Sequence, residues 1–78
     1  MDDIIERIGK LLTQVGAEQA DVRAEAELGG DLGLDSLALV EFGLVAEKEF
    51  GVKIADNDIS LDDTVDGLAR LIVSKAAG

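Results

Sequence analysis

The chain has 78 residues, 17 of them acidic and 7 basic, which gives a net charge of −10, and it contains neither Cys nor His. A chain of this length forms a single domain, residues 1–78, with a small core, and it cannot use disulfides or the usual zinc sites. Its charge excludes nucleic acids and anionic membranes as partners, because both would repel it, and favours proteins with basic surfaces.

The first predicted element is an amphipathic helix near the N-terminus. Between Ile4 and Val15 the apolar residues recur at the spacing of one helix face. Asp2 or Asp3 can cap this helix and Gly16 can end it. The segment lacks the features of a signal peptide, and no stretch of the chain approaches the roughly 20 apolar residues that cross a bilayer. We therefore expect a monomeric, cytoplasmic protein without membrane insertion.

A long connection follows over residues 17–35, where the helical periodicity is lost. Connections of this length in a compact domain are usually functional or held by a few buried residues. The apolar anchors available here are Val22, Leu28 and Leu32. Glycines close to the end of the connection make that end pliable in the prediction.

The second predicted helix runs from about Ser36 to Phe50 and is apolar on two sides. A domain this small cannot bury a helix all round, so one of these sides is expected to face a partner. One set comprises Leu39, Phe42, Val45 or Ala46, and Phe50; the other comprises Leu37, Val40 and Leu44, flanked by Glu41, Glu47 and Lys48.

The remaining chain predicts a short extended stretch, a brief helical turn near residues 56–60 and a final helix, whose apolar residues recur at helical spacing between Leu61 and Ala76. Asp56 is the expected cap of the turn, and Asp63 or Thr64 that of the last helix. The predicted fold is all-α: a small four-helix bundle with three main helices, one short helix and a long loop between the first two main helices.

Ser36 stands at the start of the second helix, in the stretch DLGLDSL. A catalytic serine needs a base, but the chain has no His and lacks the G-x-S-x-G turn, so a hydrolase is excluded. The amide groups and the dipole of a helix start would instead support a phosphate ester on this hydroxyl. The residues alone leave open the simpler reading that Asp35 or Ser36 only caps the helix.

Two other kinds of site are excluded by spacing. The stretch GGDLG matches no nucleotide-binding motif. A calcium loop beginning at Asp56 would need Gly at position 61 and Glu at position 67, where the chain has Leu61 and Gly67. We therefore predict neither a nucleotide site nor a metal site.

Three stretches carry a family pattern: DLGLDSLALVEF, EKEFGVKIADNDI and DDTVDGLARLI. Together they resemble the acyl carrier protein family over nearly the whole chain, most specifically in the D-S-L motif preceded by D-x-G-x. The resemblance implies a carrier that is not an enzyme. A phosphopantetheinyl transferase would attach 4′-phosphopantetheine from coenzyme A to Ser36, and the thiol of this arm would hold acyl groups as thioesters for fatty-acid, polyketide or related synthases.

The resemblance also implies roles for other residues. Asp35 would help to present the serine. The partner-binding residues would dock on basic patches of the synthases and the transferase; they are Leu37, Val40, Glu41, Leu44 and Glu47. A further set would line the core, where family members can shelter an acyl chain between helices: Phe42, Ala46, Phe50, Ile54, Ile59, Leu68 and Ile72.

Several positions depart from the family pattern. Ala38 stands where fatty-acid carriers often have an acid, Lys48 adds a base to the second helix, Ala55 replaces a frequent Pro, and Gly43 weakens the helix. A specialised polyketide or lipid pathway therefore stays open beside primary fatty-acid synthesis. So do a peptidyl or aminoacyl carrier of a nonribosomal pathway and a non-carrier acidic helical interaction module, in which Ser36 would be only a cap.

Overall fold

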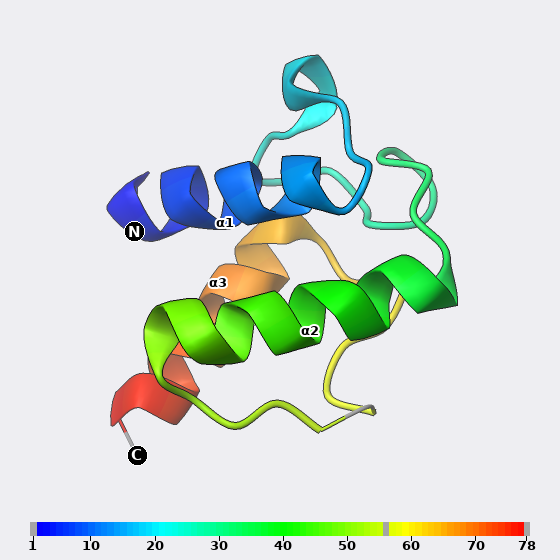
Figure 1. Cartoon of the computed structure of the whole chain (residues 1–78). Coiled ribbons are helices and arrows are strands. Elements are labelled where there is room, and N and C mark those ends of the chain that lie inside the picture. Colours follow the sequence, from blue (N-terminus) through cyan, green and yellow to red (C-terminus); the bar gives the residue numbers. More distant parts are fainter. Residues whose placement is uncertain (1, 56, 78) are drawn as a thin grey trace.

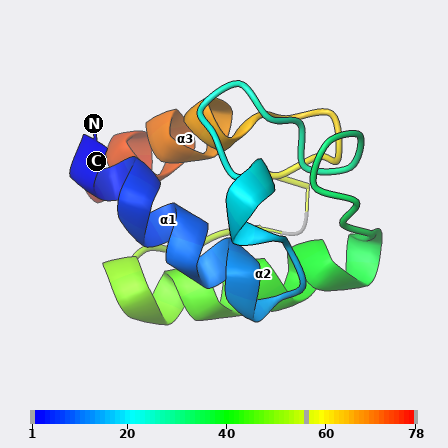
Figure 2. The same cartoon turned by 90° about the horizontal axis from the view of Figure 1, so that it is seen from above.

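The computed structural model describes residues 2–55 and 57–77. Its elements are α1 (Asp2–Gln14), the short 3₁₀ helix η1 (Gln19–Asp21), α2 (Ser36–Phe50) and α3 (Val65–Ala77). α1 packs against both α2 and α3, and the start of α1 lies at the same end of the molecule as the end of α3 (Figure 1). From above, α1 runs obliquely from the side of α3 to the side of α2 (Figure 2).

The all-α class with a long connection between the first two main helices is confirmed. α2 has the predicted bounds and ends at Gly51, whose φ of 67° is a left-handed conformation that glycine adopts without a steric penalty. α3 (Val65–Ala77) begins directly after Thr64, one of the two predicted caps. Its cap is Thr64, whose Oγ1 accepts a hydrogen bond from the Gly67 N–H at 3.0 Å.

The predicted short helix near residues 56–60 differs in the structure. Residue 57 lies in a turn and residue 58 in a bend, and residues 59 and 60 have no regular structure; Asp56, the expected cap, lies outside the described residues. The Asp58 Oδ2 accepts from the Ala55 N–H at 2.8 Å and also pairs with Lys75 Nζ at 2.8 Å. The hydrogen bond from Lys75, followed by that from the Ala55 amide, holds the pKa of Asp58 below its usual range. By accepting a hydrogen bond from the Ala55 amide, the Asp58 side chain offers the backbone an alternative to helical hydrogen bonds, which explains why a turn replaces the predicted helix.

The core lies where the three α-helices meet. α1 contributes its predicted apolar face, whereas α2 contributes small residues around one large ring, that of Phe42, which is fully buried. The helical residues of the buried cluster are Ile8, Leu11 and Leu12 of α1, Ala38, Phe42 and Ala46 of α2, and Val65, Leu68, Ala69 and Ile72 of α3.

The long connection between α1 and α2 is held by the segment that precedes α3. The Leu28 N–H donates to the Asp63 carbonyl at 2.9 Å, and the Val65 N–H donates to the Ala26 carbonyl at 3.0 Å. Leu28 and Leu32 are buried, as predicted for anchors. Because these backbone groups are paired, the connection has a defined course although it contains little regular structure.

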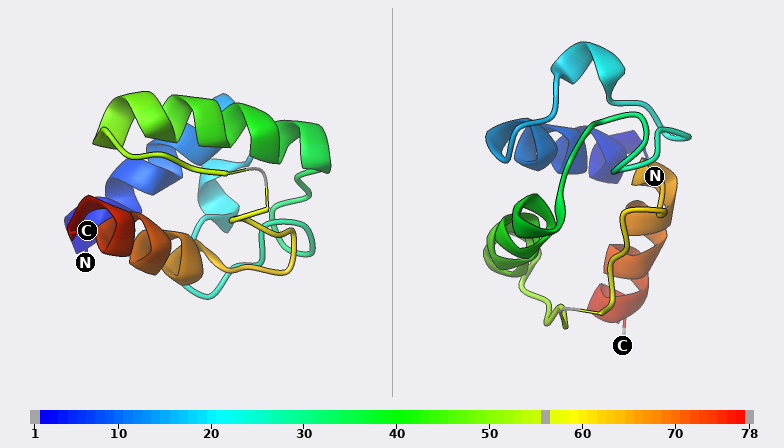
Figure 3. Two further views of the ribbon diagram at one scale, coloured as in Figure 1. Left: turned by 90° about the horizontal axis from the view of Figure 1, so that it is seen from below. Right: turned by 90° about the vertical axis from the view of Figure 1, so that its right-hand side faces the viewer.

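After α2 the chain turns back and runs alongside this helix before it enters α3 (Figure 3). This returning chain comprises residues 51–55 and 57–59. At the turn, Arg7 Nη2 lies 2.8 Å from Glu49 Oε2, and its guanidinium carbon is 4.5 Å from the centre of the Phe50 ring. The contact joins α1 to the end of α2. Because both charged side chains are nearly half exposed, we expect it to contribute no more than about 1 kcal/mol to stability.

Candidate functional site

The start of α2 presents Ser36 to the solvent. Asp35 precedes the helix in an extended conformation, and its Oδ1 accepts a hydrogen bond from the Ala38 N–H at 2.9 Å. Ser36 is the first helical residue and is exposed. Of the two candidate caps, Asp35 is therefore the residue that caps the helix. The Ser36 hydroxyl is not the group that caps the helix.

The loop that leads to Ser36 is held on both sides of its glycine turn. Gly33 has a φ of 69°, which turns the chain at little steric cost. Before it, Asp31 Oδ2 accepts from the Glu27 N–H at 2.8 Å, and after it Leu34 is buried. This end of the loop, which was expected to be pliable, therefore has fixed contacts that define where Ser36 lies.

The electrostatics of this helix start favour an anion on the serine. The backbone amides in the first turn of α2 lack intrahelical partners, and the helix dipole makes this end positive. The first turn itself carries no acidic side chain. A phosphate ester on Ser36 would thus lie next to a positive helix end. Among the described residues, no group of three or more His, Cys, Asp or Glu side chains could hold a metal ion.

Removing the cap should loosen this helix start. We expect Asp35→Ala to lower the free energy of unfolding by about 1 kcal/mol, because the Ala38 amide loses its acceptor. Asp35→Asn is the matched control, since its amide oxygen can still accept this bond. Urea denaturation of the three proteins measures the difference. Equal losses in both variants would show that charge, rather than capping, is the contribution of Asp35.

The outer face of α2 exposes large apolar side chains next to Ser36. Leu37 is 65% exposed, Val40 47% and Leu44 61%. Their spacing places them on one side of the helix. Large apolar side chains that gather on one exposed face mark interaction sites more often than isolated ones do. The predicted partner face is therefore accessible, and Glu41 within it is exposed as well.

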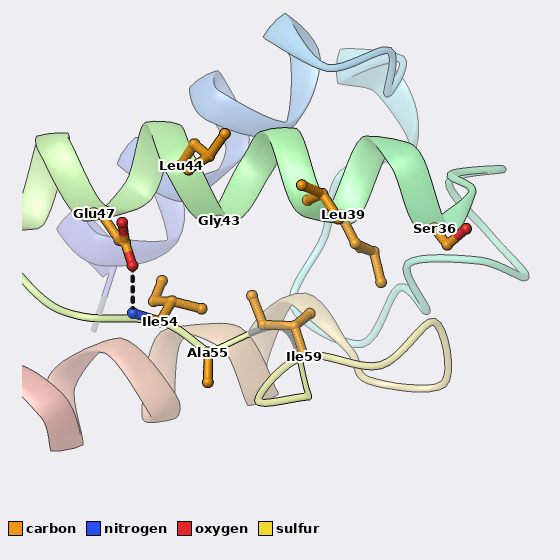
Figure 4. Close-up of a pocket in the computed structure, with 9 residues that line it drawn as sticks. Ser36, Leu39, Gly43, Leu44, Glu47, Ile54, Ala55 and Ile59 are labelled. Atoms are coloured by element: carbon orange, nitrogen blue, oxygen red, sulfur yellow. Dashed lines mark hydrogen bonds between the residues drawn. The ribbon is translucent and has the colours of Figure 1, made fainter.

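Glu47, the other acid predicted for that face, is oriented differently. It is half-buried, and its Oε2 accepts a hydrogen bond from the Ile54 N–H at 2.7 Å. Figure 4 shows this carboxylate turned from α2 toward the returning chain. The bond ties the stretch around Ile54 to α2 and directs the negative charge of Glu47 toward it.

A cavity of about 320 Å³ lies between α2 and the returning chain, with Ser36 in its wall (Figure 4). The side chains of Leu39, Ile54 and Ile59 point into the space between the two segments, and Glu47 lies at the other end from Ser36. The lining residues are Ser36, Leu39, Val40, Gly43, Leu44, Glu47, Ile54, Ala55 and Ile59.

The residues that the sequence assigned to the core have three different surroundings. Phe42, Ala46, Leu68 and Ile72 are almost completely buried in the central cluster. Ile54 and Ile59 also line the cavity, and Phe50 is half-buried beneath Arg7.

Leu39 and Gly43 line the cavity although neither was predicted to do so. A signal was available, since Leu39, Gly43 and Glu47 follow one another at four-residue steps, which places them on one helix face.

Comparison with known proteins identifies the family of this chain. The family described as "Phosphopantetheine attachment site" matches residues 4–72, from α1 into α3. Acyl carrier protein 2 of Pseudomonas aeruginosa is 42% identical over 66 residues, which cover 83% of this chain and 84% of that protein. No helix among the described residues is long and apolar enough to cross a membrane. The chain thus belongs to the acyl carrier protein family, whose covalently attached prosthetic group is 4′-phosphopantetheine.

Proposed function

We propose that Ser36 carries the phosphopantetheine arm and that the protein delivers acyl groups on this arm to fatty-acid, polyketide or related synthases. The observation that carries the proposal is the exposed Ser36 at the start of α2, where Asp35 caps the helix in its place. The serine is accessible to a modifying enzyme, and the positive helix end favours the phosphate that would be attached to it.

The composition of the chain indicates which chemical groups must come from the arm and from partner enzymes. The arm, when bound, supplies a terminal thiol that holds acyl groups as thioesters, and the chain has no Cys that could compete with it. It also has no His to remove the proton of the Ser36 hydroxyl. A transferase would therefore provide the base for attachment, and the synthases would perform the chemistry on the acyl group. The protein itself acts as a carrier, not as an enzyme.

Intact-mass measurement tests the assignment. The unmodified protein is incubated with coenzyme A and a phosphopantetheinyl transferase, weighed, and then digested so that the modified peptide can be sequenced. We expect one arm per chain, on the peptide that contains Ser36. An unmodified product, under conditions that load another carrier protein, would contradict the proposal, as would an arm on Ser60, Ser74 or a threonine.

We also propose that partner enzymes dock on the exposed face of α2 formed by Leu37, Val40, Glu41 and Leu44. This face adjoins Ser36, so an enzyme bound to it would lie near the attachment point. Its apolar side chains supply area to bury, and Glu41 can pair with a basic rim on the partner. Because the Glu47 carboxylate already bonds to Ile54, we infer that the partner's docking surface is apolar at its centre rather than uniformly basic.

Leu44→Ala should weaken this docking. Because burial of a Leu side chain is favourable by about 1.5–3 kcal/mol, we expect its truncation to cost about 1 kcal/mol of docking free energy, which corresponds to a fall of roughly fivefold in kcat/KM. The transferase reaction with coenzyme A provides the measurement, and the change should appear mainly in KM for the carrier. Val73→Ala is the control, since Val73 is 42% exposed on α3. Equal kinetics for both variants would place docking elsewhere.

A further inference from the structure

Gly43 occupies a position in α2 where the backbone conformation does not require glycine. The residue lies in the middle of a regular helix, and its φ is not positive. A glycine inside a helix is less favourable than alanine because the unfolded chain has more freedom to lose. The presence of glycine here therefore needs another physical reason.

The space around Gly43 supplies such a reason. A Cβ placed at this position would lie 3.8 Å from Ile54 Cγ2, which is an ordinary van der Waals contact. Alanine would therefore fit without a clash. A larger side chain would extend into the cavity between α2 and the returning chain, whose wall contains both Gly43 and Ile54 (Figure 4).

The position of Gly43 along this cavity determines what a side chain there would block. Gly43 is seven residues from Ser36 and Glu47 is eleven, which at 1.5 Å per residue is about 10 Å and about 16 Å along the helix axis. Gly43 thus lies between Ser36 at one end and the Glu47–Ile54 hydrogen bond at the other. A side chain here would shorten the open part of the cavity rather than close its end near Ser36.

The lining indicates the chemistry of the occupant. Leu39, Ile54 and Ile59 present apolar surface, and the cavity is within the size range of small-ligand sites. A group tethered at Ser36 starts beside this surface, so it can enter without leaving the protein. The lining favours an aliphatic chain over an amino-acid or other polar group, because a polar group would lose its hydration on entry.

We propose that Gly43 sets the length of the aliphatic acyl chain that this protein shelters, by keeping the cavity open between Ser36 and Glu47. The inference rests on the proposed function, since it requires the acyl group to be tethered at Ser36. Short acyl groups need only the part of the cavity before Gly43. Longer ones must pass Gly43, and a side chain at this position excludes them.

The test compares wild type, Gly43→Ala and Gly43→Leu, each loaded by a phosphopantetheinyl transferase with butyryl- or decanoyl-coenzyme A. Gly67→Ala is the matched control, because it makes the same helical change in α3, away from the cavity. Intact mass first establishes loading. Thermal unfolding is then recorded for each loaded protein and compared with the same protein carrying the bare arm.

We expect decanoyl loading to raise the melting temperature of wild type and of Gly67→Ala more than butyryl loading does. Gly43→Leu should lose this extra rise while it keeps the butyryl response, and Gly43→Ala should show a smaller rise than wild type. If Gly43→Leu does not fold, the inference is tested by comparing Gly43→Ala with Gly67→Ala: decanoyl loading should raise the melting temperature of Gly43→Ala less.

Two results would overturn the inference. In the first, decanoyl and butyryl loading raise the melting temperature of wild type equally. In the second, decanoyl loading raises the melting temperature of the Gly43 variants as much as that of wild type. Failure of the proposed function would be recognised separately. In that case wild type would not be loaded at the mass-measurement step, before any melting temperature is compared.

Discussion

Ser36→Ala is expected to abolish attachment of the phosphopantetheine arm while the protein stays folded. The hydroxyl oxygen is the atom that would be esterified, so its removal leaves the transferase without an acceptor. The structure adds that stability should be nearly unchanged. Because Asp35 provides the capping bond to Ala38, we expect the free energy of unfolding to change by no more than about 0.5 kcal/mol.

The control for this substitution is Ser74→Ala, which removes another exposed serine hydroxyl, in α3. Both variants are incubated with the transferase and coenzyme A, weighed intact, and unfolded in urea. Ser74→Ala should gain the arm as wild type does. If Ser36→Ala gains it as well, the assignment of Ser36 is wrong. Loss of the fold in Ser36→Ala would instead show that its hydroxyl has a structural role.

Phe42→Ala is expected to have the largest effect on stability. Phe42 is the largest of the fully buried side chains, and truncation of such a residue costs about 3–5 kcal/mol because the cavity left behind is only partly refilled. At roughly 0.05–0.15 kcal/mol per residue, a chain of 78 residues has a total stability of about 4–12 kcal/mol. The substitution therefore removes a large part of the stability or all of it.

Circular dichroism during urea denaturation measures this loss. Phe42→Leu keeps more of the buried volume and should lose less, which leaves a measurable transition if Phe42→Ala is unfolded. Leu44→Ala, on the same helix but 61% exposed, should change the free energy of unfolding by no more than about 0.5 kcal/mol. If Phe42→Ala were as stable as Leu44→Ala, the arrangement of α2 around the Phe42 ring would be wrong.

The three surfaces of α2 explain why its sequence is apolar on more than one side. Phe42 faces the core, Leu44 faces outward, and Leu39 points into the cavity beside the returning chain. The sequence indicated two apolar sides and an exposed partner face. The third surface was hidden because Gly43 and Glu47, which do not have an apolar side chain, form part of it.

The bounds of α2, the position of Ser36 at its start and the all-α class followed from the sequence alone. These features depend on spacings of three or four residues and on capping groups close by in the chain, which local backbone geometry converts directly into helices. The same local pattern failed near residues 56–60, where a helical turn was expected. Asp58 there binds Lys75, a partner seventeen residues away that helical spacing does not reveal.

Only the tertiary structure decided how the site around Ser36 is completed. Glu47 turns toward Ile54, and the chain after α2 returns alongside the helix, which creates the cavity next to Gly43. The physical reason is that these contacts join segments whose approach depends on how the whole core packs. The sequence determined which residue carries the tethering hydroxyl in the proposal. The packing determined what lies beside it.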